Sequence, residues 1–151
     1  MLVIGVGNEI RGDDAAGLLV ARRIRERNPS LSVIESSADP MTLMEAWSEE
    51  SEVVLIDAVE SGGTPGELHR HEAHERALPV DFFHCSTHSF GVAEAVEFAR
   101  NLDRLPSRLT VFGIEGRSFS AGGDVSESVL SAIESLARAI LEECETGESD
   151  A

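Results

Sequence analysis

Short apolar runs alternate with amphipathic stretches along most of this chain. The apolar runs cover 2–6, 31–35, 53–57 and 109–114, with a weaker one at 67–71. Val53-Val54-Leu55-Ile56 is continuously apolar, which is typical of a parallel strand covered on both faces. These runs have the length and composition of buried strands.

The stretches between and after these runs repeat apolar residues at helical spacing. They cover 14–27, 41–47, 90–102 and 126–144. In the last of them Val129, Ile133, Leu136 and Ile140 fall on one face, as in a helix that packs on a core. Alternating strands and helices predict an α/β fold, a three-layer α/β/α sandwich. Its sheet is expected to be mainly parallel and five-stranded, with one antiparallel edge strand.

The length of the chain predicts a single domain. With 151 residues it is long enough to bury one substantial core. We assign residues 1–144 to this domain and expect 145–151 to be a short, acidic, disordered tail. The segment 61–66, Ser-Gly-Gly-Thr-Pro-Gly, is a turn, because too little chain follows it to form a second domain.

Composition narrows the range of functions. The formal charge of −16 argues against nucleic acids and anionic membranes as partners, because both are negative. All twelve basic residues are arginine, which excludes lysine Schiff-base chemistry. The two cysteines form no C-x-x-C pair, no apolar signal segment precedes the first strand, and no run approaches the roughly 18 apolar residues of a membrane span. These features predict a cytoplasmic protein with reduced thiols.

Three chemically active side chains fall at one edge of the predicted sheet. Asp14 follows the first strand and a glycine turn, Asp57 ends the third run, and His88 precedes the third helix. Ligands of open α/β sheets bind at the carboxyl ends of the strands. Carboxylate oxygens and imidazole nitrogens also suit a divalent transition metal such as Zn²⁺ or Ni²⁺. The pattern therefore predicts a metal-binding site with positions left for substrate atoms or water.

Each of these residues also has a simpler interpretation. Asp13 or Asp14 could cap the first helix, Asp57 could cap a turn, and His88 could be an ordinary polar residue at a helix start. Nucleotide binding is a further alternative, because Gly5-x-Gly7 begins a dinucleotide fingerprint. The third glycine is missing at Ile10, although Glu35 could still accept a hydrogen bond from a ribose hydroxyl.

Two other groups of residues are weaker candidates. His69, His71 and His74 form H-x-H-x-x-H, and the first two share a face on a strand, but solvated histidines on an edge strand explain the pattern more simply. Cys85 follows His84, and a buried cysteine is a simpler interpretation than a thiol nucleophile.

The motifs together resemble those of a known enzyme family. They are Gly5-Val6-Gly7-Asn8, Gly12-Asp13-Asp14-Ala15-Ala16-Gly17, Ile56-Asp57-Ala58, Ser86-x-His88-x-x-Gly91 and Val111-Phe112-Gly113-Ile114-Glu115. In this order the chain is similar, over residues 2–143, to the [NiFe]-hydrogenase maturation endopeptidases. Members of that family remove a C-terminal extension from the precursor of the hydrogenase large subunit.

The resemblance implies a role for each of the three candidates. Asp14, Asp57 and His88 would be both the catalytic and the metal-binding residues of an aspartyl-type endopeptidase. They would engage nickel already inserted in the precursor, so the enzyme would need no tightly bound metal of its own. The implied partner is the large-subunit precursor, and we expect a monomer.

One segment departs from the family pattern. Members often carry Asp-Gly-Gly-Thr-x-Gly after the second strand, where this chain has Glu35-Ser36-Ser37-Ala38-Asp39-Pro40. The loop here is therefore expected to have a different shape. The alternative function is a non-catalytic metal- or nucleotide-binding α/β module that acts as a maturation chaperone.

Overall fold

The computed structural model describes residues 1–7, 12–79, 91–117, 119 and 122–149. Its elements are β1 (Leu2–Val6), the 3-10 helix η1 (Gly12–Ala15), α1 (Ala16–Arg27), β2 (Ser32–Ser36), α2 (Pro40–Ala46), β3 (Glu52–Val59), β4 (Leu68–Glu72), α3 (Val92–Asn101), β5 (Arg108–Glu115) and α4 (Glu127–Ser149). Within these described residues, no helix combines the length and the apolar character that crossing a membrane requires.

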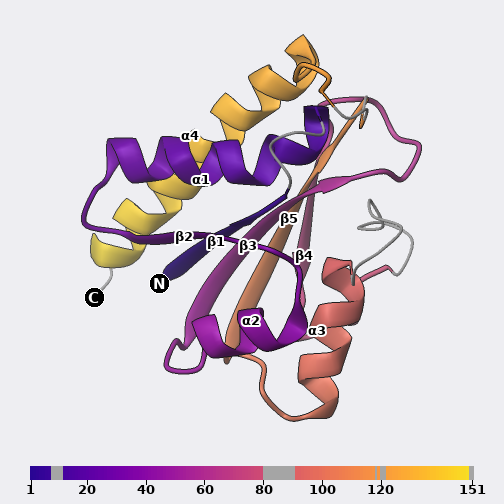
Figure 1. Cartoon of the computed structure of the whole chain (residues 1–151). Helices are drawn as coiled ribbons and strands as arrows, with labels where there is room; N and C mark the ends of the chain where they lie inside the picture. The colour runs from indigo at the N-terminus through magenta and orange to yellow at the C-terminus, as the bar shows by residue number, and fades with distance from the viewer. Residues whose placement is uncertain (8–11, 80–90, 118, 120–121, 150–151) are drawn as a thin grey trace.

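The strands form one five-stranded sheet with the order β2-β1-β3-β5-β4. The pairs β1–β2, β1–β3 and β3–β5 are parallel, and β4 lies antiparallel to β5 at one edge. Helices α1 and α4 cover one face of the sheet, and α2 and α3 cover the other (Figure 1). The predicted three-layer sandwich is thus confirmed, including its antiparallel edge strand.

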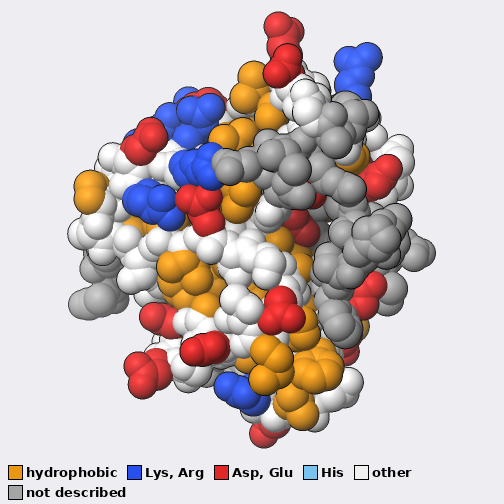
Figure 2. Space-filling view, viewed as in Figure 1, with side chains coloured by type: hydrophobic (Ala, Val, Ile, Leu, Met, Phe, Trp, Pro, Cys, Tyr) orange, Lys and Arg blue, Asp and Glu red, His pale blue; other side chains and the backbone are white. Residues whose placement is uncertain are grey.

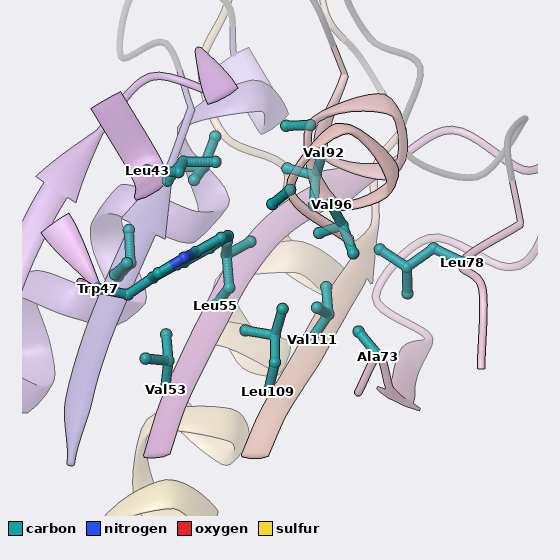
Figure 3. Close-up of a cluster of buried hydrophobic side chains, with 14 of the residues drawn as sticks. Leu43, Trp47, Val53, Leu55, Ala73, Leu78, Val92, Val96, Leu109 and Val111 are labelled. Carbon is teal, nitrogen blue, oxygen red and sulfur yellow. The ribbon is translucent and has the colours of Figure 1, made fainter. Parts of the chain in front are cut away.

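Each face of the sheet carries its own apolar core. On the α2 and α3 side the buried residues include Leu43, Trp47, Leu55, Val96 and Val111, which converge between the helices and the sheet (Figure 3). The indole nitrogen of Trp47 donates a hydrogen bond of 2.8 Å to the carbonyl oxygen of Arg104. A second cluster, which includes Val20, Ile56, Ile133 and Ile140, fills the space under α1 and α4. Apolar residues alternate between the two cores along β3 and β5, as the period of a strand requires.

Helix α1 lies very close to the sheet. A Cβ atom added at Gly17 would overlap the carbonyl oxygens of Val6 and Ile56, and one added at Gly5 would overlap the carbonyl oxygen of Gly17. Only glycine permits these contacts, because any side chain would push the helix away. The start of α1 and the preceding η1 are thereby placed against the carboxyl ends of β1 and β3.

Several element boundaries differ from those predicted, and two of the differences concern residues discussed above. Strand β3 continues to Val59, so Asp57 lies inside the strand and not at its end. The pairs Asp57–Gly113 and Val59–Glu115 extend the ladder past the apolar run, because backbone pairing does not depend on side-chain polarity. Helix α4 continues to Ser149, so residues 145–149 are helical where the sequence predicts a disordered tail. No proline interrupts this segment, and its glutamates are good helix formers.

Candidate functional site

Asp14 and Asp57 lie close together at the carboxyl edge of the sheet. Asp14 is on η1, which packs against β3, and Asp57 is on β3 itself. Alternation along β3 places Asp57 on the same sheet face as Leu55 and Val59. Both aspartates are buried, with 9% and 5% of their surface exposed. The sequence therefore identified two residues, about forty positions apart in the chain, that the fold does bring together.

Their proximity changes the acidity of Asp57. Burial raises the pKa of this carboxyl well above its usual range, and the charge of Asp14 raises it further. The hydrogen bond of 2.8 Å that the Ala58 N–H donates to Oδ1 acts in the opposite direction. Two buried carboxylates that repel each other favour the uptake of a positive charge, either a proton or a metal cation. This electrostatic environment fits the metal-binding role predicted for the pair.

Asp13 has a different role from that of its neighbour. Its side chain is fully buried and accepts hydrogen bonds from a distant part of the chain. Oδ1 accepts from the Ser126 N–H at 2.8 Å, and Oδ2 accepts from the Arg117 N–H at 2.6 Å and the Ser126 hydroxyl at 2.8 Å. The N-cap of α1 is Ala15, and no side chain caps it. Asp13 therefore bonds the segment between β5 and α4, and its interpretation as a helix cap is wrong.

His88 lies outside the described residues, as do Asn8, His84 and Cys85. Its place in the site thus stays a prediction. Among the described residues no cluster of three or more His, Cys, Asp and Glu side chains could hold a metal ion. Asp14 and Asp57 supply two oxygen donors, so a metal bound there requires further ligands from another segment or from the substrate.

Glu115 is a buried acidic residue that site prediction from sequence missed. Only 1% of it is exposed. Oε1 accepts a hydrogen bond from the Ser61 hydroxyl, Oε2 accepts one of 3.2 Å from the Ser61 N–H, and Nε2 of His69 lies 3.2 Å from Oε1. The serine hydroxyl donates its hydrogen bond to the carboxylate, whereas in a nucleophilic triad it donates to the imidazole. The sequence contained a signal for this residue, because Glu115 directly follows an apolar run, just as Asp57 does.

Two of the histidines of the H-x-H-x-x-H pattern, His69 and His74, contact different partners. His69 contacts Glu115, and the ring nitrogen Nδ1 of His74 accepts a hydrogen bond of 3.0 Å from the Leu109 N–H. Burial lowers the pKa of His71, and the neighbouring His69 lowers it further. Strand β4 is an edge strand as predicted, but His69 is held by a buried carboxylate rather than simply solvated.

Glu35 is engaged by arginines of α1. Its carboxylate lies 2.7 Å from Arg22 and 3.3 Å from Arg25, and hydrogen bonding to Arg22 is the main reason that its pKa is lowered. Figure 2 shows arginine and acidic side chains interspersed over this helix. Because the carboxylate already has two cationic partners, the structure disfavours its use for a ribose hydroxyl.

The loop after β2 ends at the start of α2. Asp39 accepts a hydrogen bond of 2.9 Å from the Thr42 N–H and caps α2, whose first residue is Pro40. This arrangement is a typical helix start. The segment that replaces the family's glycines therefore leads directly into a helix.

Comparison with known proteins identifies the family. The family model described as hydrogenase maturation protease matches residues 18–143, which include most of the fold and Asp57. The chain belongs to the hydrogenase maturation protease family. The match begins four residues after Asp14, so the assignment does not depend on the first acidic motif.

Two curated relatives share about a quarter of their aligned residues with this chain. It is 24% identical over 118 residues to the hydrogenase expression/formation protein HupD of Rhodobacter capsulatus, and these residues are 76% of this chain and 56% of HupD. The HupD protein of Rhizobium leguminosarum is 23% identical over 76% of this chain and 58% of its own. The chain thus spans less than two thirds of the length of these curated relatives.

Several solved structures match this chain over most of the length of both chains. The [NiFe] hydrogenase maturation protease HycI from Thermococcus kodakarensis is 26% identical, with a TM-score of 0.74 over 93% of this chain and 89% of that one. An endopeptidase from Escherichia coli is 25% identical, with a TM-score of 0.76 over the same shares of the two chains. The hydrogenase maturating endopeptidase HybD from Escherichia coli, at 22% identity and a TM-score of 0.76 over 97% of this chain and 92% of HybD, has the same fold.

Proposed function

We propose that this protein is an endopeptidase that removes the C-terminal extension of a [NiFe]-hydrogenase large-subunit precursor after nickel has been inserted. The observation that carries the proposal is the buried pair Asp14 and Asp57 at the carboxyl edge of the sheet. Membership of the hydrogenase maturation protease family and similarity to HycI support the same activity.

In this proposal Asp14, Asp57 and His88 bind the nickel that the precursor carries. Asp57 is prone to hold a proton, because burial and Asp14 raise its pKa. Coordination of a cation requires the ionised carboxylate, so nickel displaces that proton. The positive charge of the metal also removes the repulsion between the two aspartates. A precursor without nickel offers no such compensation and binds less well.

Binding through the metal positions the peptide next to it. Nickel supplies Lewis-acid chemistry there, and the two aspartates determine where it lies relative to the backbone of the precursor. The same contact would act as a check on maturation, because only a loaded precursor completes the coordination of the metal. The protein then requires no resident metal, and we propose that it is a cytoplasmic monomer.

Mass spectrometry of the precursor tests the proposal. Nickel-loaded and nickel-free large-subunit precursors are incubated with and without the protein, and the mass of each is measured. We expect loss of a C-terminal peptide from the loaded precursor alone. Cleavage regardless of nickel would keep the peptidase and reject the nickel check. Absence of cleavage with the cognate precursor would favour the non-catalytic binding module.

Substitutions assign the activity to the site. We expect Asp57→Asn and His88→Ala to abolish cleavage, because each removes a proposed nickel ligand. Glu26→Gln is a matched surface control, since Glu26 is an exposed residue of α1. Normal processing by His88→Ala would remove that residue from the proposed site. Elemental analysis of the purified wild-type protein checks that it carries no stoichiometric metal.

A further inference from the structure

Two further buried carboxylates flank the proposed nickel-binding pair. Asp13 is 0% exposed and Glu115 is 1% exposed. Asp13 binds the backbone of Arg117 and Ser126, which belong to the segment between β5 and α4. Glu115 binds Ser61 in the turn that follows β3. Each carboxylate therefore holds a loop at the edge of the sheet where Asp14 and Asp57 lie.

The two carboxylates are joined through three consecutive residues. Glu115 contacts Ser61 through its side chain, and the next residue, Gly116, donates its N–H to the carbonyl oxygen of Val59 at 2.9 Å. Arg117 then donates its N–H to Asp13 at 2.6 Å. The segment 115–117 thus connects η1, which carries Asp14, to the end of β3, which carries Asp57. We refer to Asp13, Glu115 and the backbone of 115–117 as the carboxylate brace.

The packing around the brace leaves little freedom. A Cβ atom at Gly116 would overlap the ring of Phe119 and lie 3.1 Å from the Cβ of Asp13. A Cβ atom at Gly63 would lie 3.0 Å from Oε1 of Glu115. The contacts therefore depend on close approach of backbone to the two acidic side chains.

Electrostatics explains why such a brace is needed. Asp14 and Asp57 are buried carboxyl groups on separate elements, and when both are ionised their repulsion favours movement of η1 away from β3. Hydrogen bonds that join η1 to the end of β3 oppose this movement. The backbone and hydroxyl donors of Arg117 and Ser126 suit the oxygens of Asp13, which accept hydrogen bonds.

We propose that Asp13 and Glu115 are positioning residues, which hold η1 on the end of β3 and thereby set the position of Asp14 relative to Asp57. They act through the backbone of 115–117 and need not touch the precursor. The proposal concerns the arrangement of the site, and only its effect on cleavage rests on the proposed function.

Hydrogen–deuterium exchange on the full-length protein tests the brace directly. In Asp13→Asn the amide NH₂ would face an N–H donor, so at least one hydrogen bond is lost. We expect amide exchange in 12–17 and 56–61 to accelerate, roughly tenfold or more, because both segments lose their connection. Glu115→Gln keeps an acceptor for Ser61, so a smaller acceleration in 56–61 is expected. Faster exchange confined to the segment between β5 and α4 would overturn the proposal.

Core variants separate positioning from general loss of stability. Ile140→Val and Ile140→Ala remove graded volume from the core under α4, away from the brace. The two variants serve as controls with a smaller and a larger loss of stability, and the melting temperature of Asp13→Asn is compared with theirs. We compare Asp13→Asn with the core variant whose melting temperature is most similar. In that core variant, we expect amide exchange in 12–17 to accelerate no more than exchange in the other elements. Equal acceleration in both kinds of variant would reduce Asp13 to a structural residue and refute the proposal.

Kinetics then connects the brace to function. With nickel-loaded precursor, Asp13→Asn is expected to lower kcat at least tenfold with little change in KM, because the precursor still docks but the aspartates are misplaced. Stability-matched core variants should retain wild-type kcat. Normal kcat in Asp13→Asn would contradict the brace. If the wild-type protein itself fails to cleave, the proposed function falls while the exchange experiment still decides the brace.

Discussion

At the scale of single residues, three of the buried acidic side chains at one sheet edge fall into two kinds. Asp13 and Glu115 have hydrogen-bond donors around their oxygens. For Asp57 the hydrogen bond from Ala58 is outweighed by burial and by Asp14, so its pKa is raised. Burial of a carboxylate without full compensation reduces stability and is characteristic of functional sites.

Replacement of Asp57 should stabilise the protein at neutral pH. The pKa of Asp57 is higher in the folded protein than in the unfolded chain. As pH rises from the unfolded to the folded pKa, the unfolded state releases the proton first, so the free energy of unfolding falls across this window. The asparagine of Asp57→Asn does not titrate, so the variant keeps this free energy of unfolding. Its amide oxygen still accepts the hydrogen bond from the Ala58 N–H.

Thermal melts of wild type and Asp57→Asn across pH measure the effect. We expect the melting temperature of the variant to exceed that of wild type near pH 7. The difference should vanish below about pH 3, where the carboxyl is protonated in both states. Glu26→Gln serves as the surface control. A variant less stable than wild type at neutral pH would contradict the raised pKa.

At the scale of elements, the site depends on how closely α1 approaches the sheet. Gly17 lies against the backbone of Val6 and Ile56, directly after η1. This contact fixes the distance between the helix start and the strand that carries Asp57. The glycine is therefore a packing residue of the site even though it has no side chain to offer.

The variant Gly17→Ala should be strongly destabilised. Its added methyl group would overlap two backbone oxygens, which cannot move without separating α1 from β1 and β3. Overpacking of this kind costs about 1–3 kcal/mol or more, despite the better helix propensity of alanine. Urea denaturation followed by circular dichroism measures the change. Glu26→Ala is the control in the same helix, and equal midpoints for the two variants would refute the close-approach argument.

A second element-scale prediction concerns the opposite face of the sheet. Trp47 at the end of α2 is 2% exposed and bonds the carbonyl oxygen of Arg104 beyond α3. Trp47→Phe removes this donor and leaves a small cavity, so we expect a loss of about 1–3 kcal/mol. Cleavage should continue, because Trp47 bonds the backbone at Arg104 and is not part of the proposed site.

Chemical denaturation and the precursor assay together check the Trp47 prediction. Met44→Leu in the same core conserves volume and should cost less than Trp47→Phe. Loss of cleavage in Trp47→Phe at a temperature where it is fully folded would contradict the prediction and show that the contact between Trp47 and Arg104 affects the site.

At the scale of the whole molecule, charge is strongly unbalanced. The formal charge is −16, and several arginines are already paired, as Arg22 and Arg25 are with Glu35 and Arg27 is with Glu134. Net repulsion among the remaining acids therefore opposes the compact state. The monomeric state that we expect is consistent with such repulsion between copies, and it stays a prediction.

Salt should stabilise this protein. Raising NaCl from about 0.05 M to about 0.5 M shortens the Debye length to a few ångströms, which screens the repulsion over the whole surface. We expect the melting temperature to rise by a few degrees, equivalent to about 1 kcal/mol for a domain of this size. Scanning calorimetry over a NaCl series measures it. A falling melting temperature would show that the arginine–carboxylate pairs outweigh the net repulsion.

The pattern of apolar and polar residues was sufficient to predict the architecture of the fold. Continuous apolar runs such as that of β3, and helical spacing such as that of α4, predict element type because burial on a sheet or a helix face has a fixed period. Element ends were less predictable. Backbone pairing carries β3 past the apolar run to Val59, and α4 reaches Ser149 without an apolar face to mark its end.

The sequence by itself determined which fold forms and which family the chain resembles, because hydrophobic periodicity and short motifs are local properties. It also indicated that Asp14 and Asp57 would meet, since the apolar runs of neighbouring parallel strands precede them. Only the tertiary structure decided that Asp13 binds Ser126 and that Glu115 binds Ser61. Such contacts join residues far apart in the chain, and their formation depends on backbone positions that no local pattern encodes.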